Sequence, residues 1–331
     1  MAKTAKSKKA STKSRSKAIS AARQSKGTVG IVGLGIMGGA FARLLKKAGW
    51  RVVGYDLSAA RRLAAKDRGI KILRNATEVA KQAPVVLTSL PSPKALESVV
   101  NEIASAKLPP ITLIELSTFA LADKQKAERR LRKAKHTTLD VPVSGTGAQA
   151  AHGDAVFYAS GDKATIKRLM PMFGDFGRAA FDVGAFGNGS KMKYVANLMV
   201  AIHNIASAEA MVLGMKAGLP PKAILELVSA GAGQSRIFDL RGPMMVQNDY
   251  DKVTATLEVF DKDLKLIGDF IRTARVPTPL FDATRPIYDK ALKAGLGAKD
   301  VAAVCAVLEK MARLKRDKTP KPPKAGPAGQ A

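Results

Sequence analysis

Residues 28–38 read TVGIVGLGIMG, a short apolar run followed by glycines spaced as G-x-G-x-x-G. The run Thr28–Val32 is rich in β-branched residues and predicts a strand. Glycines in this pattern permit a tight turn, close approach of a ligand to the backbone and close packing of the helix that follows. Amides at a helix N-terminus bind phosphate groups. The predicted pyrophosphate-binding loop consists of Gly33, Leu34, Gly35, Ile36, Met37 and Gly38.

A second predicted strand, with an acidic residue at its end, follows this loop. Residues 51–56 read RVVGYD and place Asp56 at about the 20-residue offset expected for a ribose contact. The Asp56 carboxylate would accept hydrogen bonds from ribose hydroxyls and would repel a 2′-phosphate, which favours NAD over NADP. Arg61 and Arg62 follow closely and keep NADP open as the cofactor. A purely structural glycine turn is the alternative, and the strand, helix and acid around it argue against that alternative.

Short apolar runs alternate with helical patterns from Thr28 onward, which predicts βαβ units and a doubly wound, mostly parallel sheet of the Rossmann type. Strands are expected at 28–32, 51–55, 85–90, 111–116, 137–141, 155–159 and 179–183. Helices are expected at 39–48, 59–67, 93–106 and 122–134, with a short one starting near Asn75.

Helical patterns follow one another after Gly189, which predicts an all-α C-terminal domain joined to the first domain by a long helix. Helices are expected at 191–217, 221–230, 256–274, 281–294 and 299–314. In the first of these, a stripe of apolar residues at helical spacing is expected to be buried; it consists of Met192, Val195, Leu198, Met199 and Ile202. The predicted division of the chain is a basic tail (1–26), a dinucleotide-binding domain (27–187), a helical substrate and dimerisation domain (188–316) and a Pro/Lys-rich tail (317–331).

The formal charge of +28 is concentrated partly at the two ends of the chain. Residues 1–26 hold nine basic and no acidic side chains among Ser, Thr and Ala, so no core is expected there. Such a tail could contact polyanions nonspecifically. Because the tail lacks an apolar segment, it does not resemble a secretory signal. A cytoplasmic location is expected, because mitochondrial transit peptides favour Arg and an amphipathic apolar face, which this tail lacks. The mitochondrial matrix is the alternative.

Cysteine and histidine usage narrows the class of protein further. A single cysteine, Cys305, lies in an apolar helical run and predicts a buried structural thiol without disulfides. His136, His152 and His203 lack the spacing of metal ligands, so no metal site is expected. No uninterrupted apolar run approaches about 20 residues, so no membrane partner is expected.

The segment 187–197, which reads GNGSKMKYVAN, combines a glycine turn with an amine and an amide. On a helix starting after Gly189, Lys193 and Asn197 lie one turn apart on the same face. Taken alone, this spacing is common on solvated helices. After a dinucleotide-binding domain, it predicts a proton-transfer site.

These segments together resemble the β-hydroxyacid dehydrogenases, the family of 3-hydroxyisobutyrate dehydrogenase, tartronate semialdehyde reductase and, more distantly, 6-phosphogluconate dehydrogenase. The resemblance covers residues 28 to about 314. It rests on four segments in the family's order: the glycine loop 33–38, DVPVSG at 140–145, the segment 187–197 and KDL at 262–264. The family's fold, a Rossmann domain followed by a long helix and a helical domain that dimerises, agrees with the one predicted from the residues.

The resemblance implies a role for each matching residue. Lys193 is implied to be the general acid/base, with its pKa lowered by desolvation and by neighbouring Lys191 and Lys262. The substrate, a small carboxylate, is implied to contact Ser144, Gly145, Thr146 and Asn197. The cofactor, NAD or alternatively NADP, is implied to lie beside Leu90, Pro91, Ser117, Thr118 and Lys262, in addition to the glycine loop. A homodimer or homotetramer is expected.

Three positions depart from the family's pattern. Thr146 and Gln149 stand where the family usually has glycine, and Ala120-Leu121 replaces the usual Ser-Pro. The first two are expected to change the wall of the substrate pocket, where Thr146 could narrow the site or add a hydroxyl donor. The third is expected to affect the start of a helix. The identity of the substrate therefore does not follow from the resemblance.

The predicted activity is an NAD(P)-dependent oxidoreductase that transfers hydride between a nicotinamide cofactor and a small β-hydroxyacid or its semialdehyde, of the 3-hydroxyisobutyrate kind. One alternative is a cofactor-binding fold recruited to nucleic acid through its basic tails. This alternative is disfavoured by the presence of Lys193, Asn197 and Ser144. A protein that only binds nucleic acid does not need a lysine and an amide that converge on a carboxylate site. An imine reductase on the same fold is a second alternative, and Lys193 argues against it as well.

Overall fold

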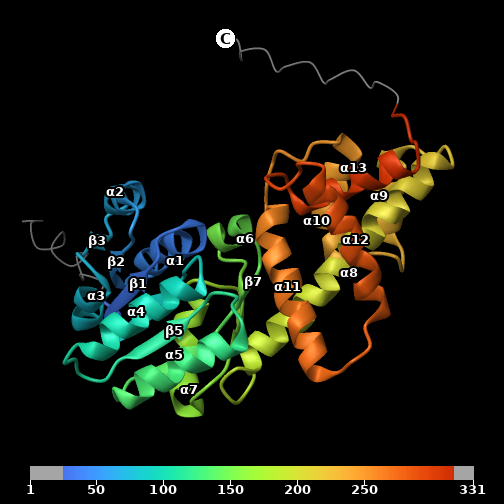
Figure 1. Ribbon diagram of the computed structural model, residues 1–331. Coiled ribbons are helices and arrows are strands. Elements are labelled where there is room, and N and C mark those ends of the chain that lie inside the picture. Colours follow the sequence, from blue (N-terminus) through green and yellow to red (C-terminus); the bar gives the residue numbers. More distant parts are fainter. Residues whose placement is uncertain (1–24, 317–331) are drawn as a thin grey trace, which may run out of the picture.

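A parallel sheet covered by helices on both faces forms the N-terminal part of the protein, and a group of helices forms the C-terminal part (Figure 1). The computed structural model describes residues 25–316. The predicted tails at 1–26 and 317–331 lie outside these residues, except for Ser25 and Lys26.

The main sheet has six parallel strands in the order β3-β2-β1-β4-β5-β6. These strands are β1 (Thr28–Val32), β2 (Arg51–Tyr55), β3 (Lys71–Ile72), β4 (Val85–Thr88), β5 (Thr112–Glu115) and β6 (Thr137–Asp140). This is the Rossmann strand order, in which ligands bind at the carboxyl ends of the strands. The α/β fold predicted from the sequence is confirmed.

A second, three-stranded sheet follows β6. It consists of β7 (Val143–Ser144), β8 (Val156–Ala159) and β9 (Ala179–Asp182). Strand β7 runs antiparallel to β8, and β8 runs parallel to β9. Strand β7 is too short to have been expected from the sequence, and it contains Ser144 of the predicted substrate loop.

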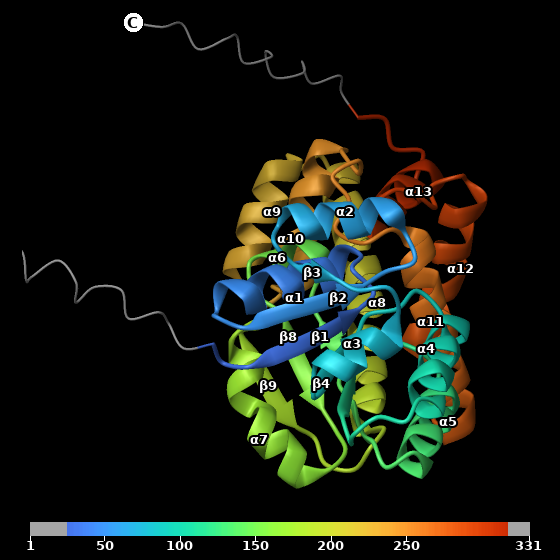
Figure 2. The same cartoon turned by 90° about the vertical axis from the view of Figure 1, so that its left-hand side faces the viewer.

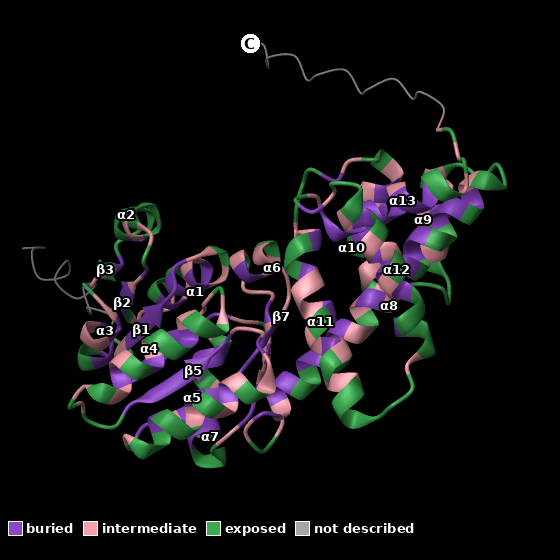
Figure 3. Cartoon of the chain, in the orientation of Figure 1, coloured by how far each residue is buried: buried purple, intermediate pink, exposed green. Residues whose placement is uncertain are grey.

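Seven helices belong to the N-terminal part. They are α1 (Ile36–Lys47), α2 (Ala59–Asp67), α3 (Ala76–Gln82), α4 (Pro93–Ser105), α5 (Leu121–Lys133), α6 (Gly147–Ala151) and α7 (Lys163–Gly174). One buried cluster joins α1, α7 and the small sheet to one face of the main sheet, and another joins α3, α4 and α5 to the other face. Strands β4 and β5 are buried along their whole length between these layers. Figure 3 shows β5 in the colour of buried residues.

The C-terminal part is built around α8 (Asn188–Lys216), which is 29 residues long. The other elements are α9 (Pro221–Ala230), α10 (Arg236–Gln247), α11 (Leu257–Ala274), α12 (Pro279–Lys293), a short 3₁₀ helix (Val301–Ala303) and α13 (Val304–Met311). Helix α8 contacts all five of the other α-helices and extends from them toward the small sheet (Figures 1 and 2). Helix α10 was not expected from the sequence.

Helix α8 is long and apolar enough to cross a membrane by length and composition alone. Its buried side chains include Lys193, Asn197 and Asn204, and its partners are protein helices, so it is the core helix of this domain. The predicted burial is wrong for Met192, Val195 and Met199, which are 39%, 51% and 46% exposed, whereas Leu198 and Ile202 are half-buried against the helical core. The helix turns its polar Lys193–Asn197 face inward and therefore exposes part of this apolar stripe.

Candidate active site

The glycine loop forms a tight turn between β1 and α1. Gly33 has a φ of 92°, and a Cβ atom there would lie 2.1 Å from the Ser89 carbonyl oxygen. Gly35 caps α1 without a side-chain hydrogen bond, and a Cβ atom there would approach only the Arg61 guanidinium, at 3.7 Å. The loop therefore presents helix N-terminal amides at an open surface, which fits a pyrophosphate group.

Asp56 is buried at the end of β2 and fixes the glycine loop. Its Oδ2 accepts a hydrogen bond from the Leu34 amide at 2.7 Å, and its Oδ1 accepts one from the Ser58 amide at 2.8 Å. The Arg61 guanidinium lies 3.7 Å from Oδ2 and is more than half exposed. An acid and a cation thus meet where the ribose of a dinucleotide would lie. Arg62 instead donates hydrogen bonds to the Asp56 and Leu57 carbonyls.

The segments after β4 and β5 meet at the same edge of the sheet. The Leu90 amide donates to Ser117 Oγ at 2.9 Å, and Pro91 follows at the exposed surface. Lys262 Nζ, from α11, donates to the Thr118 carbonyl at 2.6 Å. The structure therefore brings four of the predicted cofactor-side residues, Leu90, Ser117, Thr118 and Lys262, into one connected group.

Lys193 and Asn197 are 8% and 7% exposed on the inward face of α8. Asn197 Nδ2 donates to Asp263 Oδ2 at 2.8 Å, and Asp263 Oδ1 lies 2.7 Å from Lys262 Nζ. A polar chain therefore runs from Asn197 through Asp263 and Lys262 to Thr118. It joins the helix that carries Lys193 to the loop after β5.

The charges around Lys193 shift its proton affinity. Burial lowers the pKa of Lys193, the nearby Lys262 cation lowers it further, and Asp263 partly opposes both effects. A lysine with a lowered pKa can exchange protons near neutral pH. Lys191, which was expected to contribute, does not: it is exposed, and its Nζ bonds Asn188 Oδ1 at 3.3 Å.

The substrate loop predicted at Ser144–Thr146 continues from β7 into α6. Thr146 caps α6 by a reciprocal pair of hydrogen bonds with Gln149, in which the Thr146 amide donates to Gln149 Oε1 at 2.9 Å. Gln149 Nε2 in turn donates to Asp154 Oδ2 at 3.0 Å. The two departures from the family pattern are thus partners of one another. The Thr146 amide is therefore engaged within the loop, whereas Ser144 and Gly145 lie outside this pair of hydrogen bonds.

Gly189 allows the start of α8 to approach strands β6 and β8 closely. A Cβ atom at Gly189 would lie 2.4 Å from the Tyr158 carbonyl oxygen and 2.7 Å from that of Asp140. The absence of a side chain at Gly189 therefore serves this packing, because the space beside it is occupied by protein backbone.

Asp263 is the polar residue of the site that sequence reasoning undervalued. No catalytic role is predicted for Asp263 from the sequence, yet it contacts Asn197 and raises the pKa of Lys193. Its position directly after Lys262 in the KDL segment was the available signal. Among residues 25–316, no group of three His, Cys, Asp or Glu side chains is placed to hold a metal ion.

Two family models match almost all of the described chain. Residues 28–185 match the NAD binding domain of 6-phosphogluconate dehydrogenase. Residues 187–308 match the NAD-binding domain of NADP-dependent 3-hydroxyisobutyrate dehydrogenase.

Curated relatives and solved structures agree with these family models. The chain is 31% identical to an L-threonate dehydrogenase of Cupriavidus necator over 84% of this chain and 95% of that protein. The structure of 3-hydroxyisobutyrate dehydrogenase from Salmonella typhimurium is 30% identical, with a TM-score of 0.76 over 85% of this chain and 99% of that one. The Mycobacterium tuberculosis 3-hydroxyisobutyrate dehydrogenase, in a structure with L-serine, is 28% identical, with a TM-score of 0.78 and the same coverage. The protein therefore belongs to the β-hydroxyacid dehydrogenase family and is an NAD(P)-dependent oxidoreductase.

Proposed function

We propose that Lys193 is the general acid/base of this enzyme and that its substrate is a small β-hydroxyacid or the corresponding semialdehyde. One observation carries the proposal: a buried lysine whose pKa is lowered by burial lies beside the Asn197–Asp263–Lys262 chain. This chain ends at Thr118, on the loop that faces the predicted nicotinamide site. An isolated structural lysine would not require such a connection.

Each residue of the site has a separate role in the proposed reaction. The cofactor, when bound, supplies the hydride acceptor or donor. In the oxidative direction, Lys193 Nζ takes the proton of the substrate hydroxyl, and in the reductive direction it returns that proton. Asn197, held by Asp263, orients the substrate oxygen toward Lys193. The charges of Lys193 and Lys262 favour an anionic substrate.

We propose that the substrate carboxylate binds at the turn between β7 and α6. Ser144 offers a hydroxyl there, and Gly145, with a φ of 138°, allows a backbone conformation that side chains rarely adopt. Because the Thr146 amide donates to Gln149 instead, Ser144 and Gly145 are the proposed hydrogen-bond donors to the carboxylate. We therefore expect acids with a short chain, and L-threonate and 3-hydroxyisobutyrate are the first to test because relatives are named for them.

A substrate screen with NAD and with NADP tests the proposal. The panel contains L-threonate, 3-hydroxyisobutyrate, D-glycerate, tartronate semialdehyde, 4-hydroxybutyrate, succinic semialdehyde and a cyclic imine. Absorbance of the reduced cofactor is followed for each compound. Turnover of at least one acid or semialdehyde is expected. Reduction of the imine alone would replace this proposal with the imine-reductase alternative.

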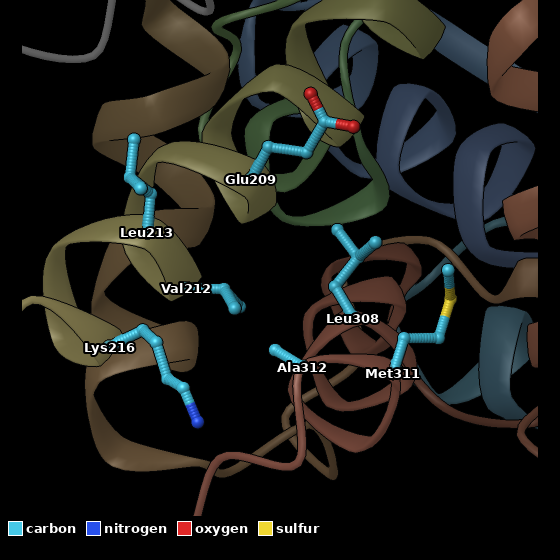
Figure 4. A pocket seen from close by; sticks show the side chains of 7 residues that line it. All are labelled: Glu209, Val212, Leu213, Lys216, Leu308, Met311 and Ala312. Atoms are coloured by element: carbon cyan, nitrogen blue, oxygen red, sulfur yellow. The ribbon is translucent and has the colours of Figure 1, made fainter.

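We further propose that the helical domain forms a homodimer. Leu213 and Met311 are exposed at a groove of about 330 Å³ between α8 and α13, which is otherwise lined mainly by apolar side chains (Figure 4). Met192, Val195 and Met199 add exposed apolar surface on the same helix. Light scattering should show a dimer or a tetramer. Leu213→Glu should shift that mass toward the monomer, whereas Leu63→Glu, at an exposed leucine of α2, should not.

Nonspecific contact with polyanions is a separate proposal that rests on charge. A groove of about 630 Å³ between α4 and α5 is lined by five basic residues and only two acidic ones. The basic residues are Lys94, Lys126, Arg129, Arg130 and Lys133. Binding of duplex DNA should weaken steeply with salt, as phosphate neutralisation requires. Weak binding that does not depend on salt would contradict the proposal. Comparing the affinity for DNA with and without residues 1–26 measures how much of the binding the tail contributes.

A further inference from the structure

A fully buried lysine, Lys124, lies between the cofactor side and the catalytic helix. It belongs to the first turn of α5, and its side chain has no exposed surface. Its Nζ lies 2.6 Å from Glu115 Oε2 and 2.8 Å from Asp140 Oδ1. Both carboxylates are buried as well. Neither the hydride transfer nor the proton transfer proposed above uses this cluster.

The Glu115 side of the cluster leads to the loop beside the predicted nicotinamide site. Glu115 ends β5, and its Oε1 accepts a hydrogen bond from the Ser117 amide at 2.9 Å. Ser117 Oγ in turn accepts from the Leu90 amide. One carboxylate therefore fixes Ser117 directly and, through Ser117, the segment after β4.

The Asp140 side leads to the helix that carries Lys193. Asp140 Oδ2 accepts from the Ser190 amide at 2.8 Å, and Oδ1 accepts from Ser190 Oγ at 2.9 Å. Ser160 Oγ donates to the Asp140 carbonyl and accepts from the Gly189 amide at 3.0 Å. Asp140 thus holds the first turn of α8, only three residues before Lys193.

The charges of the cluster depend on one another. Burial alone would lower the pKa of Lys124, but Asp140 and Glu115 together raise it, so Lys124 keeps its charge. Burial raises the pKa of Glu115, and Lys124 opposes that effect. The helix dipole disfavours a cation in the first turn of α5. At this position Lys124 therefore stabilises the two buried carboxylates rather than its own helix.

The hydroxyl of Tyr194 provides a further contact across the same region. It donates to the Phe119 carbonyl at 2.5 Å, which joins α8 to the loop after β5. Tyr194 is the neighbour of Lys193, and Phe119 is the neighbour of Thr118. The cluster and this hydrogen bond therefore connect the same two segments.

We propose that Lys124 is a positioning residue for hydride transfer: its bonds to Glu115 and Asp140 fix the loop 117–119 against the N-terminus of α8. The loop lies on the cofactor side, and the N-terminus of α8 sets the position of Lys193. The catalytic part of this inference rests on the proposed function, whereas the geometric part does not. Displacement of a reacting group by about 1 Å can cost about 100-fold in rate.

The test compares Lys124→Met, which has similar length and no charge, with Arg132→Met on the same helix. Arg132 is exposed and pairs with Glu128 at the surface, so it controls for loss of a charge from α5. Turnover of the best compound from the screen is measured, together with hydrogen exchange in residues 116–119 and 189–194. Lys124→Met should lower kcat by about 100-fold with a smaller change in the cofactor KM. It should also raise exchange in both segments, and Arg132→Met should do neither.

Glu115→Gln provides a second test, which also applies where Lys124→Met does not fold. Lys124 then keeps Asp140 as its partner, so only the segment 116–119, on the cofactor side, should become more mobile. Exchange should rise in residues 116–119 and stay unchanged in 189–194, with a drop in kcat. The proposal is overturned if folded Lys124→Met keeps the kcat of the wild-type enzyme, or if exchange rises evenly across the domain. It is also overturned if Glu115→Gln changes neither segment. If no compound is turned over, the proposed function fails, and exchange still decides the geometric role of Lys124.

Discussion

Lys193 lies near two charged groups of α11 that act on it in opposite directions. Burial and Lys262 lower the pKa of Lys193, and Asp263 raises it. With Lys193 as the proposed general base, oxidation requires its neutral amine, so the rate should rise with pH and level off below the ordinary lysine pKa of 10.5. The pH dependence of kcat/KM therefore reports the balance among these groups.

Two substitutions should shift the rising limb of the pH profile of kcat/KM in opposite directions. Lys262→Met removes a cation that lowers the Lys193 pKa, so the limb should move to higher pH. Asp263→Asn removes the carboxylate that raises it, so the limb should move to lower pH. Full pH profiles of kcat/KM in the oxidative direction measure both shifts. Shifts of the same sign in the two variants would contradict the assignment of this limb to Lys193.

Arg61 is the residue that should decide how well NADP is accepted. Its guanidinium lies beside Asp56 and above Gly35, where it could offset the repulsion between Asp56 and a 2′-phosphate. Arg61→Ala should raise the KM for NADP while changing the KM for NAD little. Lys66→Ala, at an exposed position on the same helix, is the control. Equal changes for the two cofactors would exclude a role of Arg61 in their discrimination.

At the scale of elements, the start of α8 depends on the absence of a side chain at Gly189. An added Cβ would meet two backbone carbonyl oxygens, which cannot move without displacing the strand ends. Gly189→Ala should destabilise the fold by roughly 1–3 kcal/mol and reduce turnover.

Gly214→Ala on the same helix is the matched control for this prediction. The added Cβ there meets only side-chain atoms of Ile224 and no backbone atom, with Ile224 Cδ1 at 2.5 Å. Chemical denaturation of both variants measures the difference in unfolding free energy. Equal stability of the two variants would show that the Gly189 contact is not needed.

The elements that the sequence predicts well are long and have a regular pattern. The five longest strands of the parallel sheet and helices such as α4 and α11 follow directly from apolar periodicity. The missed helices α7 and α10 contain Pro171 and Pro243, which are expected to interrupt a helix. Strands β3 and β7 have only two residues each, so no alternation is visible in them.

At the scale of the whole molecule, the site was predictable where its residues are close in sequence. The glycine loop and the Lys193–Asn197 pair could be read from local spacing. Contacts such as Asn197 to Asp263 join residues 66 positions apart, and no local pattern encodes them. Local pattern does not distinguish Lys124 from the other cations of α5, although it shares a helix face with buried Ala127 and Leu131.

The inward orientation of α8 also depends on the complete fold. An apolar stripe usually faces a core, but here the polar face that carries Lys193 lies inside, and part of the stripe is exposed. The exposed stripe is the reason to expect association between subunits. The domain boundaries, the roles of the tails and the cytoplasmic location stay predictions.

The most direct test of the central claim compares Lys193→Met with Lys191→Met. Both remove one amine from the first turns of α8, but only Lys193 is buried in the site. With the acid identified by the screen, Lys193→Met should lose about 10²- to 10⁴-fold in kcat while still binding NAD or NADP. Lys191→Met should keep a turnover close to that of the wild-type enzyme. A Lys193→Met enzyme that oxidises the acid at the wild-type rate would contradict the account.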